Sequence, residues 1–309
     1  MIQKPIDVLA AFPIRKSKAQ KQVFRSAVTD YAQKLGYCAT VEEGKMGVRN
    51  VVIGDPNRAS YLITAHYDTP ASIGLPNLIA PNNPVMFFLL QFVLVGILVG
   101  VAVLTGFVAF WLGAEGRLPF LAGYAVYMVL LLLMLFGPAN RNNANDNTSG
   151  VVTVLETMAS LPEAQRSQVC FVLFDLEEAG LVGSAAYRKL HKDATENQVV
   201  LNMDCVGHGD VIQITPVKKA KEDKALLERL SAVCGKTGNK ELRLRSRGFY
   251  QGSSDHKNFP KGVAIMAFQY QKGVGLYCGR IHTWRDKILD TENVSVLRDA
   301  LIAFLSNEK

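Results

Sequence analysis

Short apolar segments alternate along the chain with segments whose apolar residues recur at helical spacing. Six segments read as strands, and several of them are apolar throughout, which is typical of strands buried on both faces of a sheet. They are Val51–Ile53, Tyr61–Ala65, Val169–Phe174, Val199–Met203, Val211–Ile214 and Val263–Phe268. Helical periodicity marks Phe24–Leu35, Val151–Met158 and Val294–Leu305. This alternation predicts a single α/β domain.

Two much longer apolar segments interrupt this pattern. Val85–Leu112 and Leu118–Phe136 are separated only by Gly113–Arg117, and no charged residue occurs from position 71 to position 114. Each segment is near or above the ~20 apolar residues that a helix needs to cross a bilayer. A buried core helix of this length would normally carry a polar stripe. We therefore predict a transmembrane helical hairpin at residues 85–136, in contact with the lipid bilayer.

The predicted hairpin divides the remaining sequence into two parts. Residues 1–84 and 137–309 are expected to form one discontinuous domain, because both ends of a hairpin lie on the same side of a bilayer. Within the hairpin, Gly96 and Gly100 are four residues apart, a spacing that favours close helix packing.

The N-terminal region does not look like a cleavable secretion signal, because Lys4, Asp7 and Arg15 interrupt its apolar residues. The five cysteines are scattered without CxxC spacing, as expected of reduced thiols in the cytosol. We therefore expect an integral protein of the plasma membrane whose folded domain lies on the cytoplasmic side.

The formal net charge of +7 raises the question of an anionic partner. The chain has no basic segment interleaved with aromatic residues and no glycine-rich phosphate loop, so we do not expect it to bind nucleic acid. Attraction to anionic lipid headgroups is a simpler explanation for a membrane protein. The oligomeric state stays open, a homo-oligomer included.

Residues of types that can bind metal ions follow three of the predicted strands, and one more such residue precedes a predicted helix. These side chains are His66, Asp68, Asp146, Glu177, Glu178 and Asp204. Ligand sites in open α/β sheets gather at the carboxyl ends of strands, so we expect these groups to converge. So many carboxylates would repel one another without a cation. Two zinc ions with a bridging carboxylate would resolve this conflict, given a second histidine ligand.

Six sequence motifs in order resemble peptidase family 28, the co-catalytic zinc aminopeptidases. They are AHYD at 65–68, NANDNTSG at 143–150, EEAGLVGS at 177–184, NMDCVG at 202–207, SSDH at 253–256 and IHT at 281–283. The resemblance covers the chain except the hairpin. It implies a three-layer α/β/α zinc-exopeptidase fold with a mixed, mostly parallel central sheet.

The resemblance also implies a role for each site residue. One zinc ion would be held by His66 and Asp204, the other by Glu178 and His282, and Asp146 would bridge the two. Asp68 would orient His66, which would fix the tautomer of the ring. Glu177 would act as the general base that takes a proton from the attacking water. The motif SSDH and its surroundings suggest that Tyr250, Asp255 and His256 contact the substrate.

The expected activity is that of a membrane-anchored di-zinc aminopeptidase that removes N-terminal residues from short peptides. A dipeptidase, or an amidase acting on N-acyl amino acids, uses the same chemistry and stays open. A glutaminyl cyclase shares the fold but uses one zinc ion, and it fits the complete two-metal ligand set less well. A membrane scaffold without catalysis is disfavoured by the presence of Glu177 and all five ligands.

Overall fold

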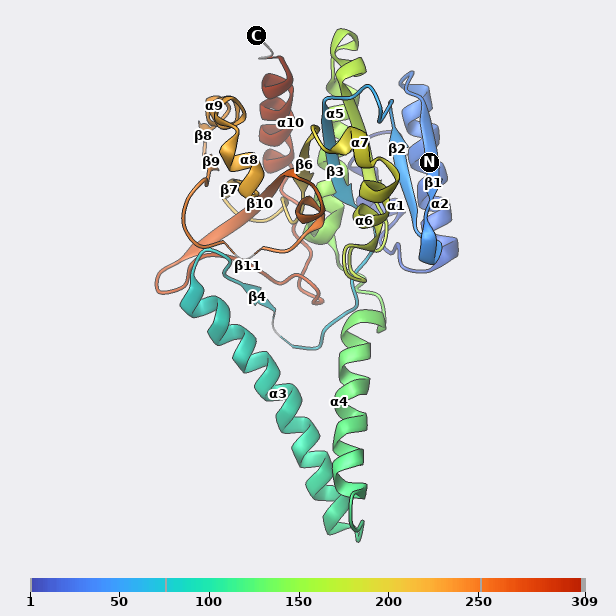
Figure 1. Cartoon of the computed structure of the whole chain (residues 1–309), viewed down its shortest axis with the longest axis vertical. Coiled ribbons are helices and arrows are strands. Elements are labelled where there is room, and N and C mark those ends of the chain that lie inside the picture. The colour runs from blue at the N-terminus through green and yellow to red at the C-terminus, as the bar shows by residue number, and fades with distance from the viewer. Residues whose placement is uncertain (1, 76, 251, 307–309) are drawn as a thin grey trace.

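A mixed sheet forms the centre of the protein, which is known here as a computed structural model that describes residues 2–75, 77–250 and 252–306 (Figure 1). Its strands lie in the order β1 (Ala39–Glu43), β2 (Arg49–Ile53), β5 (Val169–Phe174), β3 (Tyr61–His66), β6 (Val199–Met203), β10 (Lys261–Gln271), β7 (Val211–Pro216), β9 (Lys240–Leu244) and β8 (Gly235–Thr237). Off this path, β11 (Gly275–Gly279) pairs with β10, and β4 (Leu78–Ile79) pairs with β11. The four central strands β5, β3, β6 and β10 are parallel, and antiparallel pairs flank them. All six predicted strands are therefore confirmed.

Helices cover both faces of the sheet. Alternate residues of the central strands point to opposite sides, so each face presents apolar side chains that the helices bury. In β3, Ile63 packs into one apolar cluster and Leu62 into the other. The first cluster includes residues of α2 (Lys18–Lys34), α5 (Gly150–Ser160), α9 (Lys224–Ala232) and α10 (Thr291–Ser306). The second includes Tyr187 of α6 (Val182–Leu190) and Phe259. The predicted three-layer α/β/α fold is confirmed.

Shorter helical segments complete the described part of the chain. They are α1 (Asp7–Ala11), α7 (Lys192–Thr195), α8 (Lys218–Glu222), η1 (Lys45–Gly47), η2 (Ala144–Ser149), η3 (Glu163–Gln168) and η4 (Asp255–Asn258). Of these, η2 matters most for the site, because it leads directly into α5 and carries Asp146.

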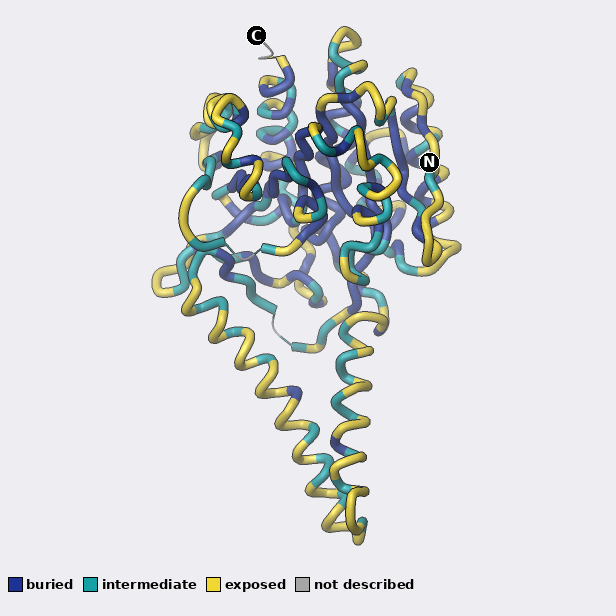
Figure 2. The backbone as a smooth tube through the Cα atoms, viewed as in Figure 1, coloured by how far each residue is buried: buried dark blue, intermediate teal, exposed yellow. Residues whose placement is uncertain are grey.

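Two long apolar helices project away from the sheet, α3 (Pro84–Trp111) and α4 (Leu118–Phe136) (Figures 1 and 2). Asn83 caps α3 by accepting a hydrogen bond from the N–H of Met86, and Pro84 suits the first helical position. Both helices are long and apolar enough to span a membrane, and only 6% of an 18-residue apolar stretch in each helix is buried. This exposure excludes a pair of buried core helices and suggests association with a membrane.

The two helices touch near their connecting loop and diverge toward the sheet (Figure 1). A Cβ atom at Gly123 would lie 2.5 Å from the carbonyl oxygen of Ala102, and one at Gly106 would lie 2.9 Å from a carbonyl oxygen of α4. These glycines therefore permit the close approach. A Cβ atom at Gly96 or Gly100, by contrast, would have no atom of α4 within 4 Å. The predicted helix packing through this pair is therefore wrong. The reason is the divergence of the helices at that height.

Candidate metal centre

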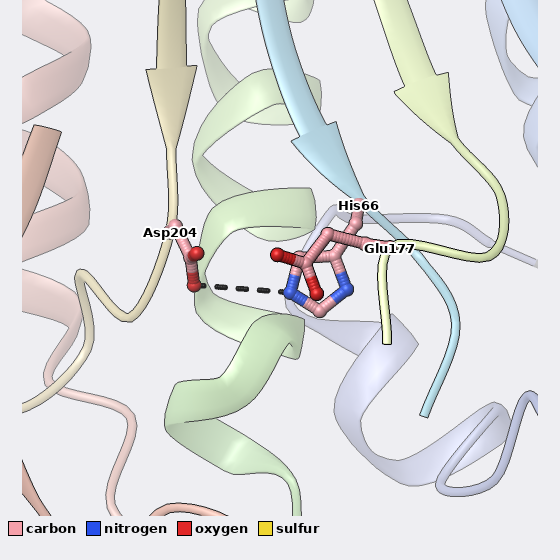
Figure 3. Close-up of side chains that lie close together, drawn as sticks. All are labelled: His66, Glu177 and Asp204. Atoms are coloured by element: carbon pink, nitrogen blue, oxygen red, sulfur yellow. Dashed lines mark ion pairs between the residues drawn. The ribbon is translucent and has the colours of Figure 1, made fainter. Parts of the chain in front are cut away.

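The carboxyl ends of the central strands deliver the predicted site residues to one place. His66 is the last residue of β3, Asp204 follows β6 directly, and Glu177 lies in the turn after β5. Figure 3 shows these three side chains pointing toward one another from the three strand ends. The three side chains meet because β5, β3 and β6 are adjacent and parallel, so the carboxyl ends of these strands lie at the same edge of the sheet.

Asp146 lies between two histidines and presents one oxygen to each. Its Oδ1 is 3.3 Å from Nε2 of His66, and its Oδ2 is 3.0 Å from Nε2 of His282. On the first side, Asp204 Oδ1 lies 3.8 Å from His66 Nε2. On the second side, Glu178 Oε2 lies 3.5 Å from His282 Nε2. The five predicted ligands thus form two halves that share one carboxylate.

The donor atoms of this cluster fit divalent cations. His66, Asp146 and Glu178 form one group whose donor atoms all lie within 4.8 Å, and His66, Glu177 and Asp204 form another. Oε1 of Glu178 is buried and has no hydrogen-bond partner among the described residues. A buried carboxylate oxygen without a partner is costly, and a metal ion would satisfy it. Nitrogen and carboxylate donors together are the ligand set that zinc prefers.

Burial and mutual repulsion shift the pKa values in this cluster. Burial, followed by the charges of neighbouring acids, raises the pKa of Glu177 and of Glu178 well above the usual value. Burial lowers the pKa of His66, but the charge of Glu177 and contacts with Asp146, Asp204 and Asp68 outweigh it, so the net pKa is well above normal. Burial raises the pKa of Asp146, but hydrogen bonds with the two histidines lower it more. The site therefore holds protons wherever no metal ion compensates its negative charge.

Asp68 supports the turn that carries the two glutamates. Its carboxylate accepts the N–H groups of Glu177 at 3.0 Å and of Glu178 at 3.2 Å. Its Oδ1 lies 3.5 Å from Nδ1 of His66, which is longer than a normal hydrogen bond. The structure therefore places Asp68 beside His66 as predicted, and it adds a function that the sequence did not reveal.

Asp286 has a similar supporting position that the sequence analysis missed. Its two oxygens accept the N–H of Asn145 at 2.8 Å and the N–H of Asp146 at 3.0 Å. Burial raises its pKa to about 7. The only available signal was its place in the segment after His282, where one more acid is unremarkable.

Arg15 is a second missed residue. Its side chain is fully buried and donates to the carbonyl oxygen of Tyr67 at 2.6 Å and to the hydroxyl of Thr148 at 3.0 Å. These bonds tie the segments that follow β3 and precede α5, next to Asp68 and Asp146. Burial lowers its pKa to about 10, so the guanidinium stays charged and offsets part of the negative charge.

Cys205 lies next to two of the predicted ligands. Its thiol is grouped with Asp146 and Asp204 by distance. Contact with the thiol of Cys278, and then burial, raises its pKa well above normal. The prediction that it is a small core residue agrees with its packing against Phe268 and Cys278.

Two of the three predicted substrate-contact residues border a cavity, and the third is buried. Tyr250 and His256 line a cavity of about 280 Å³, whose wall also contains Lys257. Asp255 is fully buried, neither of its oxygens has a hydrogen-bond partner among the described residues, and burial raises its pKa to about 7. Burial lowers the pKa of His256 to about 4, so its ring is neutral. Contact of these residues with substrate stays a prediction.

Comparison with known proteins gives a consistent result. No curated protein sequence matches the chain. An aminopeptidase of Legionella pneumophila, LapA, has a similar structure with a TM-score of 0.58 and 15% identity, over 98% of this chain and 67% of that one. A zinc-dependent exopeptidase of Parabacteroides distasonis has a TM-score of 0.62 and 14% identity, over 98% and 97%. A glutaminyl cyclase of Macrostomum lignano has a TM-score of 0.55 and 11% identity, over 97% and 87%.

The sequence of the second part of the chain identifies the family. Residues 133–304 match peptidase family M28, and this match spans more than half of the 309 residues. It begins inside α4 and therefore excludes β3 with His66 and Asp68, which the hairpin separates from the other site residues. With the matched fold and the zinc-type donor set, the chain belongs to peptidase family M28 and is a zinc-dependent hydrolase.

Proposed function

We propose that this protein is a membrane-anchored di-zinc aminopeptidase. Residues 1–84 and 137–309 form its discontinuous catalytic domain, and residues 85–136 form a hairpin that spans the plasma membrane, with the domain in the cytoplasm. The observation that carries the proposal is Asp146, which turns one oxygen toward each of two histidines. A single-metal site has no need of such a bridge.

The chain's own residues account for the chemistry. His66 and Asp204 would hold one zinc ion, Glu178 and His282 would hold the other, and Asp146 would offer one carboxylate oxygen to each. The chemistry supplied by zinc at this site would be polarisation of the scissile carbonyl and a lower pKa of the attacking water. Glu177, partly buried and with a raised pKa, accepts the proton of the attacking water and returns it to the leaving amine. Asp68 holds the turn that orients Glu177.

Removal of N-terminal residues is the form of the activity that the resemblance and the similar structures favour. LapA is described as an aminopeptidase, and the Parabacteroides protein as an exopeptidase. A cluster this rich in acids also suits a substrate with a free, positively charged amino group. The glutaminyl cyclase likeness concerns the fold alone, at 11% identity.

The test uses the full chain in detergent or bilayers and a library of short peptides with free or acetylated N-termini. We expect about two zinc ions per chain and stepwise loss of N-terminal residues from free peptides only. Glu177→Gln, in the same preparation, is the inactive control. Cleavage of N-acyl amino acids or of dipeptides alone would replace the aminopeptidase proposal, and loss of ammonia from N-terminal glutamine without hydrolysis would indicate a cyclase.

A further inference from the structure

The loop between β11 and α10 carries His282 and also forms one wall of a second cavity. This cavity, which we call the root cavity, has a volume of about 330 Å³. Its walls include Leu75, Leu78, Tyr277, Arg280, Trp284 and Arg285. Most of this lining is apolar or aromatic, and two arginines supply the positive charge. Nothing in the proposed hydrolysis uses it.

The root cavity lies where the hairpin joins the domain. Ile73, in the segment that leads to α3, donates its N–H to the carbonyl oxygen of His282 at 2.7 Å. Asn142, in the segment that follows α4, donates its side-chain N–H to the carbonyl oxygen of Trp284 at 2.8 Å. Figure 1 shows β4 and β11 beside the end of α3 that is nearest the sheet. If α3 and α4 span a bilayer, the cavity therefore lies at its surface.

The arginines of the root cavity have no anionic partner within the described part of the chain. Arg280 and Arg285 are exposed, and neither guanidinium takes part in an ion pair or hydrogen bond there. The guanidinium carbon of Arg285 lies 5.2 Å from the ring centre of Trp284, and Nζ of Lys287 lies 5.8 Å from the same ring centre. The nearest acid in sequence, Asp286, is buried and occupied by two backbone N–H groups.

The segments that border the bilayer also lack negative charge. No acidic residue occurs from position 71 to 114 or from position 116 to 145, while Arg117 and Arg141 do. Exposed cations and an exposed tryptophan, next to segments without carboxylates, are typical of the membrane interface.

We propose that the root cavity binds the headgroup of an anionic phospholipid. The phosphate lies between Arg280 and Arg285, since planar guanidinium groups bind phosphate oxygens well. The start of an acyl chain packs against Leu75 and Leu78, and Trp284 lies at the headgroup level. A soluble phosphate would use the arginines but not the apolar wall, so the lining favours a lipid. This inference rests on the proposed membrane insertion, and not on the proposed hydrolysis.

Tryptophan fluorescence tests the proposal, because the chain has only two tryptophans, Trp111 and Trp284. In Trp111→Phe, the emission reports Trp284 alone. We reconstitute this variant in bilayers of phosphatidylcholine with increasing phosphatidylglycerol, and separately add inorganic phosphate. We expect a saturable blue shift with phosphatidylglycerol, quenching by a headgroup nitroxide lipid, and no response to phosphate.

Charge variants assign the response to the arginines. Each neutralised arginine should weaken phosphatidylglycerol binding about fivefold, so Arg280→Gln with Arg285→Gln should need about 25-fold more lipid. The matched control, Lys192→Gln with Lys236→Gln, removes two exposed cations of the domain and should change nothing. An unchanged titration in the arginine variant, or an equal response to phosphate, would overturn the proposal.

A second variant separates this inference from the membrane proposal. In Trp284→Phe, Trp111 at the end of α3 reports insertion of the hairpin. If nitroxide lipids quench Trp111 in this variant, the hairpin inserts. If the emission of Trp284 in Trp111→Phe then does not change with phosphatidylglycerol, the proposed headgroup site is wrong. Zinc content and peptide hydrolysis, measured on the same preparations, show whether the catalytic proposal holds independently.

Discussion

Glu177 is the residue on which the proposed chemistry depends. It lies partly buried among other acids, and desolvation raises its pKa well above normal. Glu177→Gln keeps the size and hydrogen bonding of the side chain but cannot accept a proton. We expect turnover to fall ~100-fold or more, as for loss of a general base, while zinc content stays unchanged. Steady-state kinetics and metal analysis of the purified variant check both parts.

Asp146→Ala gives the matched contrast. Because Asp146 faces both histidines, its removal should lower zinc content as well as turnover. If Glu177→Gln lost metal to the same extent, Glu177 would be a ligand and no longer a candidate base.

The raised pKa values make zinc binding depend on pH. In protein stripped of metal, His66 and Glu178 hold protons that must leave when zinc binds, so zinc affinity rises with pH. Their folded pKa values exceed the unfolded ones, near 6.5 and 4.5, so the stripped protein loses stability as pH rises above these values. The lowered pKa of Asp146 acts in the opposite sense, but only below about 3.8.

We therefore expect zinc to raise the melting temperature more at about pH 8 than at about pH 6. Thermal unfolding with zinc or with a chelator at each pH measures this difference. An increment that is equal at both pH values would show that these groups do not exchange protons for metal.

At the scale of single residues, the sequence predicts the candidate metal ligands better than the residues that hold those ligands in position. His66, Asp146, Glu178, Asp204 and His282 could be predicted because their types and motifs identify a zinc centre, and the structure brings them together. Arg15 and Asp286 could not, because their roles arise from contacts with distant backbone groups that no local pattern records.

Elements were predictable where burial leaves a strong pattern. The central strands are apolar throughout because both faces are covered, so they stand out in the sequence. The edge strand β1, Ala39–Glu43, is largely exposed and reads as polar, and it was not predicted. The close contact of α3 with α4 at Gly123 also depends on the angle between the helices, which the spacing of glycines does not fix.

The loop that carries His282 depends on the segment that returns from the hairpin. His282 has a φ of 57°, in the left-handed region that non-glycine residues rarely adopt, so its surroundings must hold it there. Asn140 donates its side-chain N–H to the carbonyl oxygen of Thr283 at 3.0 Å. Asn140→Ala should therefore weaken zinc binding about 10-fold, as for loss of a residue that orients a ligand.

Competition with a zinc chelator measures this change. Asn82→Ala is the control, since Asn82 lies at the other end of the hairpin and pairs with Gln213, away from the ligand loop. Equal losses in both variants would mean that the hairpin roots stabilise the domain in general and not the loop.

For the whole molecule, the proposed topology predicts which surfaces meet the outside. The sheet's carboxyl ends and the candidate metal centre lie at the end of the domain from which the hairpin projects (Figure 1). With the five native cysteines replaced, Glu115→Cys in the hairpin loop should react with an impermeant thiol reagent in intact cells. Lys192→Cys, exposed on the domain, should react only after lysis. The reverse pattern would place the domain outside, and protection of both would mean that the hairpin does not span.

The position of the hairpin within the ligand set also orders events during synthesis. His66 leaves the ribosome before α3 and α4, and Asp146, Glu178, Asp204 and His282 leave it afterwards. If the helices insert as they emerge, the nascent chain is already in the bilayer when the second of its proposed ligands is synthesised. Under the proposed topology, hydrolytic competence would then be acquired only by chains that have reached their membrane, and no active peptidase would be released into the cytosol on the way.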